Sequence, residues 1–204
     1  MNYLDTSKIR VCNILENNYD IILDEYRNFN FNLPIDLSRD INWELWKRSH
    51  SKSLDNSRYD TSDIDWETVT IEPYKKSHSW YGLNVNGMSI WDGIVIAARG
   101  KSTPIGEKFF TNTFNILERY DEIISISLAR FPANKVIPLH NGYPILNRIH
   151  FPLFVPQGDI GFCVNDECIR WTEGKCIAFN DGSQHRAWNN TEEDRINLII
   201  DVKR

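Results

Sequence analysis

The feature that most constrains the fold is a run of short, apolar segments that fills the chain from Thr68 to the C-terminus. These segments are rich in β-branched and aromatic residues, and Gly, Pro, Asn and Asp separate them, as is typical of strands and turns. One interruption, at 111–120, has helical character. So many short strands in succession are typical of a sandwich or a jelly-roll barrel. The expected strands are residues 80–85, 90–97, 123–131, 147–155, 160–164, 167–171, 175–179 and 195–202.

The first 65 residues have a different character. Apolar residues recur there at three- and four-residue spacing, which predicts an amphipathic helix, and a second, shorter helix is expected near 43–46. Residues 49–65 are rich in Ser, Asp and Asn and predict a loop. We therefore expect one domain over 1–204, mainly β with flanking helices. Residues 1–65 would form a helical flank that packs outside a β-barrel core at 68–204. The helical positions are Val11, Ile14, Leu15, Tyr19, Ile22 and Leu23.

Composition narrows the functional classes. Hydrophobic residues make up 41% of the chain and charged residues 25%, as in ordinary globular proteins, and the net charge of −5 argues against binding a nucleic-acid polymer. No signal-peptide core or apolar run long enough to cross a membrane is visible in the sequence. The four cysteines, Cys12, Cys163, Cys168 and Cys176, have no zinc-site spacing. The three in strand-like apolar runs are expected to be buried free thiols, which suits a reduced, cytoplasmic protein.

Histidines and arginines in the strand-rich half carry the functional signal. His140 follows a proline-bounded loop (VIPLHNG) and His185 follows a turn (FNDGSQH), so each lies at the mouth of a strand. Arg148 and His150 are two residues apart in a strand and share one face. Arg195 opens the last strand. An arginine on the inner face of a barrel is costly to bury unless it meets an anion, and a dicarboxylate can supply that partner.

Four segments together resemble the aspartyl/asparaginyl β-hydroxylase family of Fe(II)/2-oxoglutarate-dependent oxygenases. The resemblance implies a double-stranded β-helix, a jelly-roll and cupin-like barrel, with Fe(II) held by His140 and His185, and with 2-oxoglutarate and O2 as co-substrates. It implies that Arg195 binds the distal carboxylate of 2-oxoglutarate, while Arg148 and His150 lie near its keto-acid end. A serine assists this arginine in relatives, and Ser127 is the nearer match, with Ser125 the alternative. The segments are HNG at 140–142, RIHFPLFVP at 148–156, WTEGKCIAFNDGSQHRAWN at 171–189 and DRINLIIDV at 194–202.

The sequence departs from the usual pattern in three places. Most enzymes of this chemistry add a carboxylate two residues after the first histidine, and Gly142 stands there instead. In the family a water takes that place, although an open position can also hold a halide. Asp181 is a conceivable third ligand. Asn180 replaces an aspartate of the family motif, and the spacing from the first histidine to the arginine is one residue shorter.

The resemblance implies a dioxygenase that hydroxylates an unactivated C–H bond of an amino acid, a peptide or a peptide-like natural product, converting 2-oxoglutarate to succinate. One alternative is a halogenase that uses the position left open by Gly142. A second is a metal-binding cupin-like barrel without oxygen chemistry, in which His140, His150 and His185 are three ligands. A third is a partner-binding domain whose histidines are incidental. Trp188 is expected to pack under His185 or to line the site. Further candidate wall residues are Trp80, Trp91 and Arg99.

Overall fold

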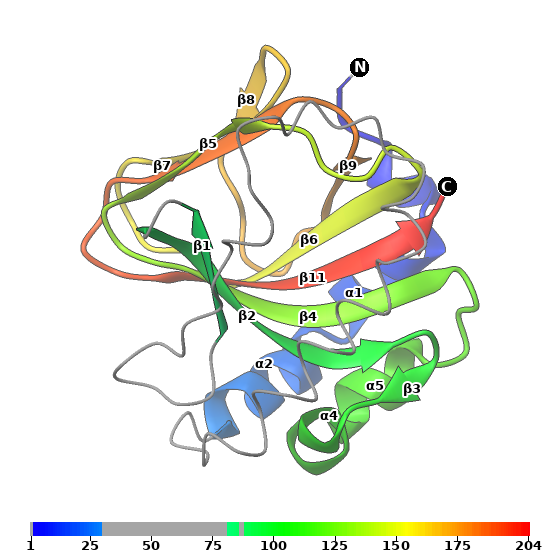
Figure 1. The fold of residues 1–204 in the computed structure, drawn as a ribbon. Coiled ribbons are helices and arrows are strands. Elements are labelled where there is room, and N and C mark those ends of the chain that lie inside the picture. The colour runs from blue at the N-terminus through cyan, green and yellow to red at the C-terminus, as the bar shows by residue number, and fades with distance from the viewer. Residues whose placement is uncertain (1, 30–80, 86–87) are drawn as a thin grey trace.

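The computed structural model describes residues 2–29, 81–85 and 88–204 (Figure 1). The helix expected near 43–46, the loop at 49–65 and Trp80 lie outside the described residues, as does the side chain of Trp91. The expected boundary between a helical flank and a barrel core also falls there, so the domain arrangement stays a prediction. Among the described residues, no helix combines the length and apolar character that crossing a membrane requires.

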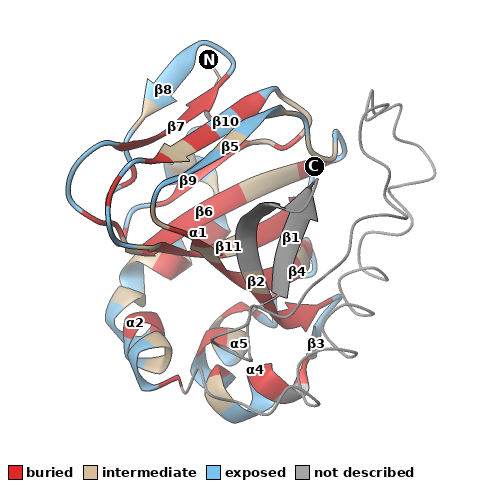
Figure 2. Cartoon of the chain, turned by 60° about the vertical axis from the view of Figure 1, so that its left-hand side comes forward, coloured by how far each residue is buried: buried red, intermediate tan, exposed pale blue. Residues whose placement is uncertain are grey.

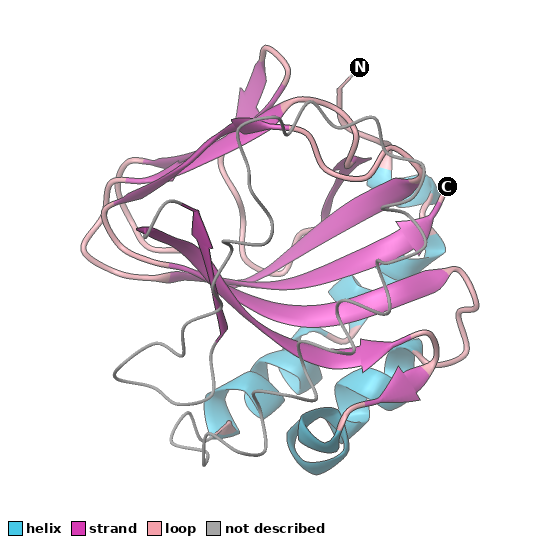
Figure 3. Cartoon of the chain, viewed as in Figure 1, coloured by secondary structure: helices cyan, strands magenta, loops and turns pink. Residues whose placement is uncertain are grey.

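Two antiparallel sheets face each other (Figures 1 and 3). From β4 onward the chain alternates between the two sheets, except at the β7–β8 hairpin, which lies within the small sheet. This is the strand order of a jelly roll, so the predicted double-stranded β-helix is confirmed. The seven-stranded sheet runs β1 (Tyr81–Val85), β2 (Met88–Ala98), β4 (Ile123–Phe131), β11 (Arg195–Lys203), β6 (Leu146–Phe154) and β9 (Ile177–Asn180), with β3 (Lys101–Ser102) beside β2. The four-stranded sheet runs β5 (Lys135–His140), β10 (His185–Asn189), β7 (Ile160–Val164) and β8 (Glu167–Ile169).

The described helices cover one face of the seven-stranded sheet (Figure 1). A short 3-10 turn, η1 (Thr6–Lys8), precedes α1 (Arg10–Asn17) and α2 (Tyr19–Asn28), and α4 (Pro104–Phe109) and α5 (Thr111–Leu117) follow β3. The predicted apolar stripe is confirmed: Val11, Leu15 and Ile22 are each at most 1% exposed and pack against the sheet. Glu25 of α2 ties this layer together by accepting hydrogen bonds from the α5 backbone at Asn112 and Thr113.

One face of β11 is apolar and packs in the core, and the other face carries buried polar side chains. Ile196, Leu198 and Ile200 belong to the apolar core under the helices. Arg195 and Asn197 point the other way, into the space between the two sheets, as the alternation of a strand predicts. The central strands β6, β7 and β11 are mostly buried, whereas β5 and β8 carry exposed residues (Figure 2). The polar face of β11 is therefore the floor of the candidate site between the two sheets.

Two expectations need correction. The segment KVIPLH, expected as a loop, forms β5, an outer strand of the small sheet where the missing N–H of Pro138 is tolerated. Cys163 and Cys168, expected as free thiols, form a disulfide. The physical reason is register, because the β7–β8 hairpin sets these two residues directly opposite each other. Cys176 is free and buried, as expected, and so is Cys12.

Candidate active site

His140 and His185 lie side by side on two neighbouring strands of the small sheet. His140 ends β5 and His185 begins β10, and the ladder between these strands sets the two residues directly opposite. Their ring centroids are 4.1 Å apart. His185 is only 4% exposed, whereas His140 is partly exposed. The two histidines singled out in the sequence are therefore brought together as one pair.

Both rings are fixed in the same way and kept neutral. The Nδ1 atoms of His140 and His185 lie 2.8 Å from the carbonyl oxygens of Pro138 and Ser183, respectively, so each Nδ1–H can donate and each Nε2 keeps its lone pair. Burial, together with the neighbouring His140 ring, lowers the pKa of His185 to about 3. Burial also lowers the pKa of His140. Neutral imidazole with a free Nε2 is the form that binds transition metals.

A carboxylate occupies the space beside Gly142. Asp181, which follows β9, is fully buried, and a Cβ added to Gly142 would overlap its carboxyl group. The Asp181 Oδ2 atom accepts a 2.6 Å hydrogen bond from the Tyr143 backbone N–H, and the Gly142 N–H donates to the Asp181 carbonyl at 2.7 Å. The Asp181 Oδ1 atom lies 3.9 Å from Nε2 of His185. Gly142 thus makes room for a negative charge that arrives from another strand.

Arg148 is held between two carboxylates. Its Nη1 lies 2.9 Å from Asp181 Oδ1, while its Nε and Nη2 donate to the two oxygens of Asp201 at 2.7 and 3.1 Å. Ser125 Oγ donates to the same Asp201 carboxylate at 3.1 Å. Burial alone would lower the pKa of Arg148, but Asp181 and Asp201 outweigh that effect and raise it. Arg148 is therefore a charged clamp on Asp181, and any contact with 2-oxoglutarate would have to compete with these partners.

Arg195 has the opposite environment. It is 4% exposed, and its buried Nε has no hydrogen-bond partner. Within the described part of the chain, no carboxylate lies at ion-pair distance from it. The guanidinium stands over the ring of Trp171, 4.5 Å from the centroid, and 5.4 Å from that of Phe131. Burial lowers the pKa of Arg195 to about 9. A buried cation without a counter-ion is costly, so this end of the site is suited to an anion.

His150 and Ser127 occupy one row of the floor. The ladders place both opposite Ile199, and Arg195 is four residues further along β11, about 13 Å at the ordinary rise of a strand. His150 accepts a 3.3 Å hydrogen bond from Trp171 Nε1, and burial, followed by the charge of Arg195, holds its pKa well below the usual range. The contact between Ser127 and Arg195 stays a prediction. In the amide orientation that satisfies its neighbours, Asn197 accepts a hydrogen bond from Arg195 Nη1.

His150 does not complete a three-histidine site. Over residues 2–29, 81–85 and 88–204, no group of three or more His, Cys, Asp or Glu side chains is arranged to hold a metal ion. Within these ranges, neither His150 nor Asp181 joins His140 and His185 in such a group. This geometry counts against the three-ligand alternative.

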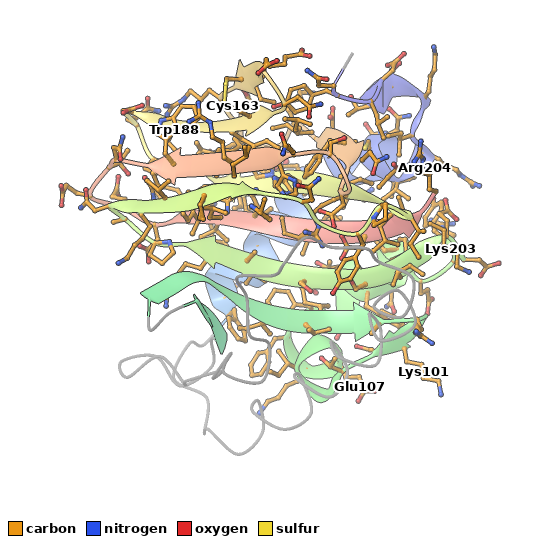
Figure 4. The ribbon with its side chains drawn as sticks, turned by 45° about the horizontal axis from the view of Figure 1, so that its top comes forward. Lys101, Glu107, Cys163, Trp188, Lys203 and Arg204 are labelled. Carbon is orange, nitrogen blue, oxygen red and sulfur yellow. A yellow bond between two sulfur atoms is a disulfide. The ribbon has the colours of Figure 1, made fainter. Side chains whose placement is uncertain are left out.

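Two expected wall residues lie elsewhere. Trp188 points to the face of β10 opposite His185, where its ring covers Gly161 and its Nε1 donates to Asp159 at 2.6 Å (Figure 4). Arg99 lies in the exposed turn after β2.

Sequence reasoning gave no role to three residues that shape the site. Trp171, Asn197 and Asp201 each contact one of the two buried arginines. A signal for the last two was present, because they alternate with core residues on the same strand as Arg195.

Comparison with known proteins identifies relatives. A sequence model of the family described as "Aspartyl/Asparaginyl beta-hydroxylase" matches residues 16–204. The "Ornithine lipid ester-linked acyl 2-hydroxylase" of Rhizobium tropici is 27% identical over 114 residues, which cover 54% of this chain and 41% of that protein. The "Aspartyl/asparaginyl beta-hydroxylase" of Mus musculus is 22% identical over 125 residues, 58% of this chain and 17% of that protein. The aligned stretch is therefore less than half of either relative.

Among solved structures, a 2OG-Fe(II) oxygenase-family oxidoreductase from Burkholderia pseudomallei superimposes with a TM-score of 0.41 at 13% identity, covering 55% of this chain and 68% of that one. At this low level of similarity, the assignment of a jelly roll rests on the strand order described above.

Proposed function

This chain belongs to the aspartyl/asparaginyl β-hydroxylase family, and we propose that it is an Fe(II)- and 2-oxoglutarate-dependent dioxygenase that hydroxylates an aliphatic C–H bond. The observation that carries the proposal is the presence of two features between the two sheets of one barrel. Two neutral histidines face each other at one end, and a buried arginine without a counter-ion lies at the other. The first suits a metal and the second suits a carboxylate.

The donor set fits a ferrous ion. Two imidazoles with free Nε2 atoms are the protein ligands, and their Nδ1 contacts to backbone carbonyls fix the ring orientations. His140 and His185 would hold the metal, and Asp181 would stand beside it as a second, non-ligating charge, clamped by Arg148. When bound, Fe(II) with 2-oxoglutarate supplies oxygen activation, and the co-substrate leaves as succinate and CO2.

The charges of the site favour a dianion. Arg148, Asp181 and Asp201 together carry one net negative charge, which leaves one net positive charge at the metal end once a divalent ion is bound. Arg195 adds another positive charge at the far end. A keto-diacid with one carboxylate at each end would neutralise both. The bound co-substrate would then shield Arg195 from the cost of remaining buried and unpaired.

The environment of Gly142 favours hydroxylation over chlorination. A halide would need the open position beside Gly142, and the carboxylate of Asp181 fills that space. Its negative charge, fixed by Tyr143 N–H and Arg148, would also repel a chloride ion. We therefore propose that the Asp181 carboxylate itself takes this place and acts there as an acceptor for a water at the metal. This is a contribution of the chain itself, because Tyr143 N–H and Arg148 fix the acceptor at a defined position.

The substrate is proposed as a small molecule, an amino acid, a peptide or a peptide-like compound. The two relatives are named for the acyl 2-position of an ornithine lipid and for aspartyl and asparaginyl β-carbons. Both positions are carbons next to a carbonyl group. We propose that the target here is likewise a methylene beside a carboxyl, amide or acyl carbonyl.

Co-substrate binding and turnover test the proposal together. Under anaerobic conditions, Fe(II) and 2-oxoglutarate should produce a visible charge-transfer band that His140→Ala or His185→Ala abolishes. Arg195→Ala should weaken 2-oxoglutarate binding far more than metal binding. The matched control is Arg186→Ala, because Arg186 adjoins His185 but is exposed on the other face of β10. Release of succinate with amino acids, peptides or acyl amides, with and without chloride, then identifies the substrate class. Tight metal binding without any 2-oxoglutarate affinity would overturn the proposal.

A further inference from the structure

We propose that Asn197 is a positioning residue that holds the Arg195 guanidinium by a neutral contact and thereby makes the site selective for a dicarboxylate. The inference rests on the proposed function, because it concerns the same co-substrate pocket. It assigns to Asn197 the assistance to Arg195 that the family resemblance had led us to expect from a serine, and it attributes co-substrate selectivity to the charge of that assisting group.

The contacts of Asn197 are defined on both sides. The side chain is fully buried and lies on the same face of β11 as Arg195. In the amide orientation that satisfies its neighbours, the side-chain oxygen accepts from Arg195 Nη1 and the nitrogen donates to the Ile196 carbonyl at 3.0 Å. The β11–β6 ladder shifts register between Ile196 and Asn197, so this carbonyl lies at an irregular point of the sheet. The second contact fixes the amide, and the amide in turn fixes the guanidinium.

Because the Asn197 amide is neutral, its contact leaves the positive charge of Arg195 uncompensated. A carboxylate at the same place would cancel the charge of Arg195, as Asp181 and Asp201 do for Arg148. An amide oxygen satisfies one N–H and leaves the full charge available. The Trp171 and Phe131 rings complete the support without adding negative charge. Nε remains without a hydrogen-bond partner, so a carboxylate can approach the guanidinium along that edge.

Selectivity follows from the separation of the two ends of the pocket. The metal end can bind the keto-acid group of any 2-oxo acid, because that group needs only the metal and its surroundings. The distal carboxylate has Arg195 as its partner, since Arg148 is already paired with two carboxylates. A change at Asn197 should therefore alter the affinity for 2-oxoglutarate and leave the affinity for a 2-oxo monoacid, such as 2-oxobutanoate, unchanged.

The test compares three substitutions with redox-inert Mn(II) as the bound metal. Dissociation constants for 2-oxoglutarate and 2-oxobutanoate are measured by calorimetry, and binding is followed independently by indole fluorescence, because Trp171 stacks on Arg195. Asn197→Asp should weaken 2-oxoglutarate binding by about tenfold or more, the effect of one internal charge pair, and leave 2-oxobutanoate unchanged. Asn197→Leu removes the acceptor and should weaken 2-oxoglutarate binding selectively. Asn197→Ser restores a smaller acceptor and should recover part of the loss.

The outcomes separate the two proposals. If the wild-type protein binds Mn(II) but no 2-oxoglutarate, the proposed function fails. If the wild type binds 2-oxoglutarate and Asn197→Asp binds it equally well, only the inference about Asn197 fails. An equal loss for both keto acids would show a merely structural role and would also overturn it. If Asn197→Asp does not fold, as judged by circular dichroism, the comparison of Asn197→Leu with Asn197→Ser decides, and equal 2-oxoglutarate affinities in those two variants would refute the inference.

Discussion

Replacing Gly142 by alanine tests whether Asp181 fills the place left by the missing carboxylate. The glycine has an ordinary negative φ, so alanine meets no backbone strain there, and the effect is purely steric. The added methyl would overlap the Asp181 carboxyl group, whereas ordinary contacts of a Cβ are at least 3.4 Å. Asp181 would have to move by roughly an ångström or more, which breaks its hydrogen bond from Tyr143 N–H and its ion pair with Arg148.

The cost can be estimated from the contacts that are lost. Breaking a buried ion pair costs about 3–5 kcal/mol, so Gly142→Ala should lower the free energy of unfolding of the metal-free protein by about 3 kcal/mol. Urea denaturation followed by circular dichroism measures this change. Gly100→Ala is the steric control, because a Cβ at Gly100 meets nothing within 4 Å. Because Gly100 has a φ of 71°, alanine at this position should lower the free energy of unfolding only through backbone strain, by about 1–2 kcal/mol.

A second background isolates the clash. In an Asp181→Gly protein the carboxylate is gone, so adding Ala at 142 should cost less than about 0.5 kcal/mol and can even stabilise by restricting the unfolded chain. The coupling energy between the two sites should therefore exceed about 2 kcal/mol, within the range seen for residues in contact. If Gly142→Ala cost the same in both backgrounds, the carboxylate of Asp181 would not be occupying the space beside Gly142.

Three further measurements check other parts of the structure. The pKa of His185 is lowered to about 3 in the folded state, below the ~6.5 of an unfolded chain, so the unfolded protein binds more protons between these values. In the metal-free protein, His185 should therefore account for about 2 kcal/mol of the stability lost from pH 7 to pH 5. His185→Gln should remove that share from the urea-denaturation profile, and the slope that remains belongs to His140 and His150, whose pKa values are also lowered. Reducing the short Cys163–Cys168 loop should lower stability by about 2 kcal/mol at most, and thiol labelling of the unreduced native protein should be slow. Glu25→Ala removes the acceptor at the start of α5 and should cost about 1–2 kcal/mol in thermal or urea unfolding, whereas Asp24→Ala should not.

The alternation of β11 and the pattern of strands could be read from the sequence, because both depend on local periodicity. Strand alternation alone places Arg195 and Ile196 on opposite faces, and they lie so in the structure. Segment KVIPLH was missed as a strand because Pro138 is unfavourable inside a sheet, and only its position beside β10, at the outside of the small sheet, makes it acceptable. That position is a property of the whole fold.

The groups that complete the site depend on pairings between distant strands. Asp201 meets Arg148 because β11 and β6 are neighbours and place the two residues directly opposite. Asp181 reaches the histidines because β9 runs beside β6 and ends at this end of the barrel. The same holds for Cys163 and Cys168, whose proximity comes from hairpin register. Residue type and spacing identified the histidines and arginines, and register decided which partner each received.

The two buried arginines show that the partner sets the role of a side chain. Arg148 lies between two carboxylates that neutralise its charge, and its role is to fix Asp181 beside the histidine pair. Arg195 has an amide and two aromatic rings, so its charge remains for a ligand. The gain in free energy for the distal carboxylate of a dianion is therefore concentrated at Arg195. A site built in this way binds the keto-acid end through the metal, and it recognises the length and second charge of its co-substrate through one guanidinium. Substitutions around Arg195 should therefore change the choice of co-substrate more than they change the affinity for the metal.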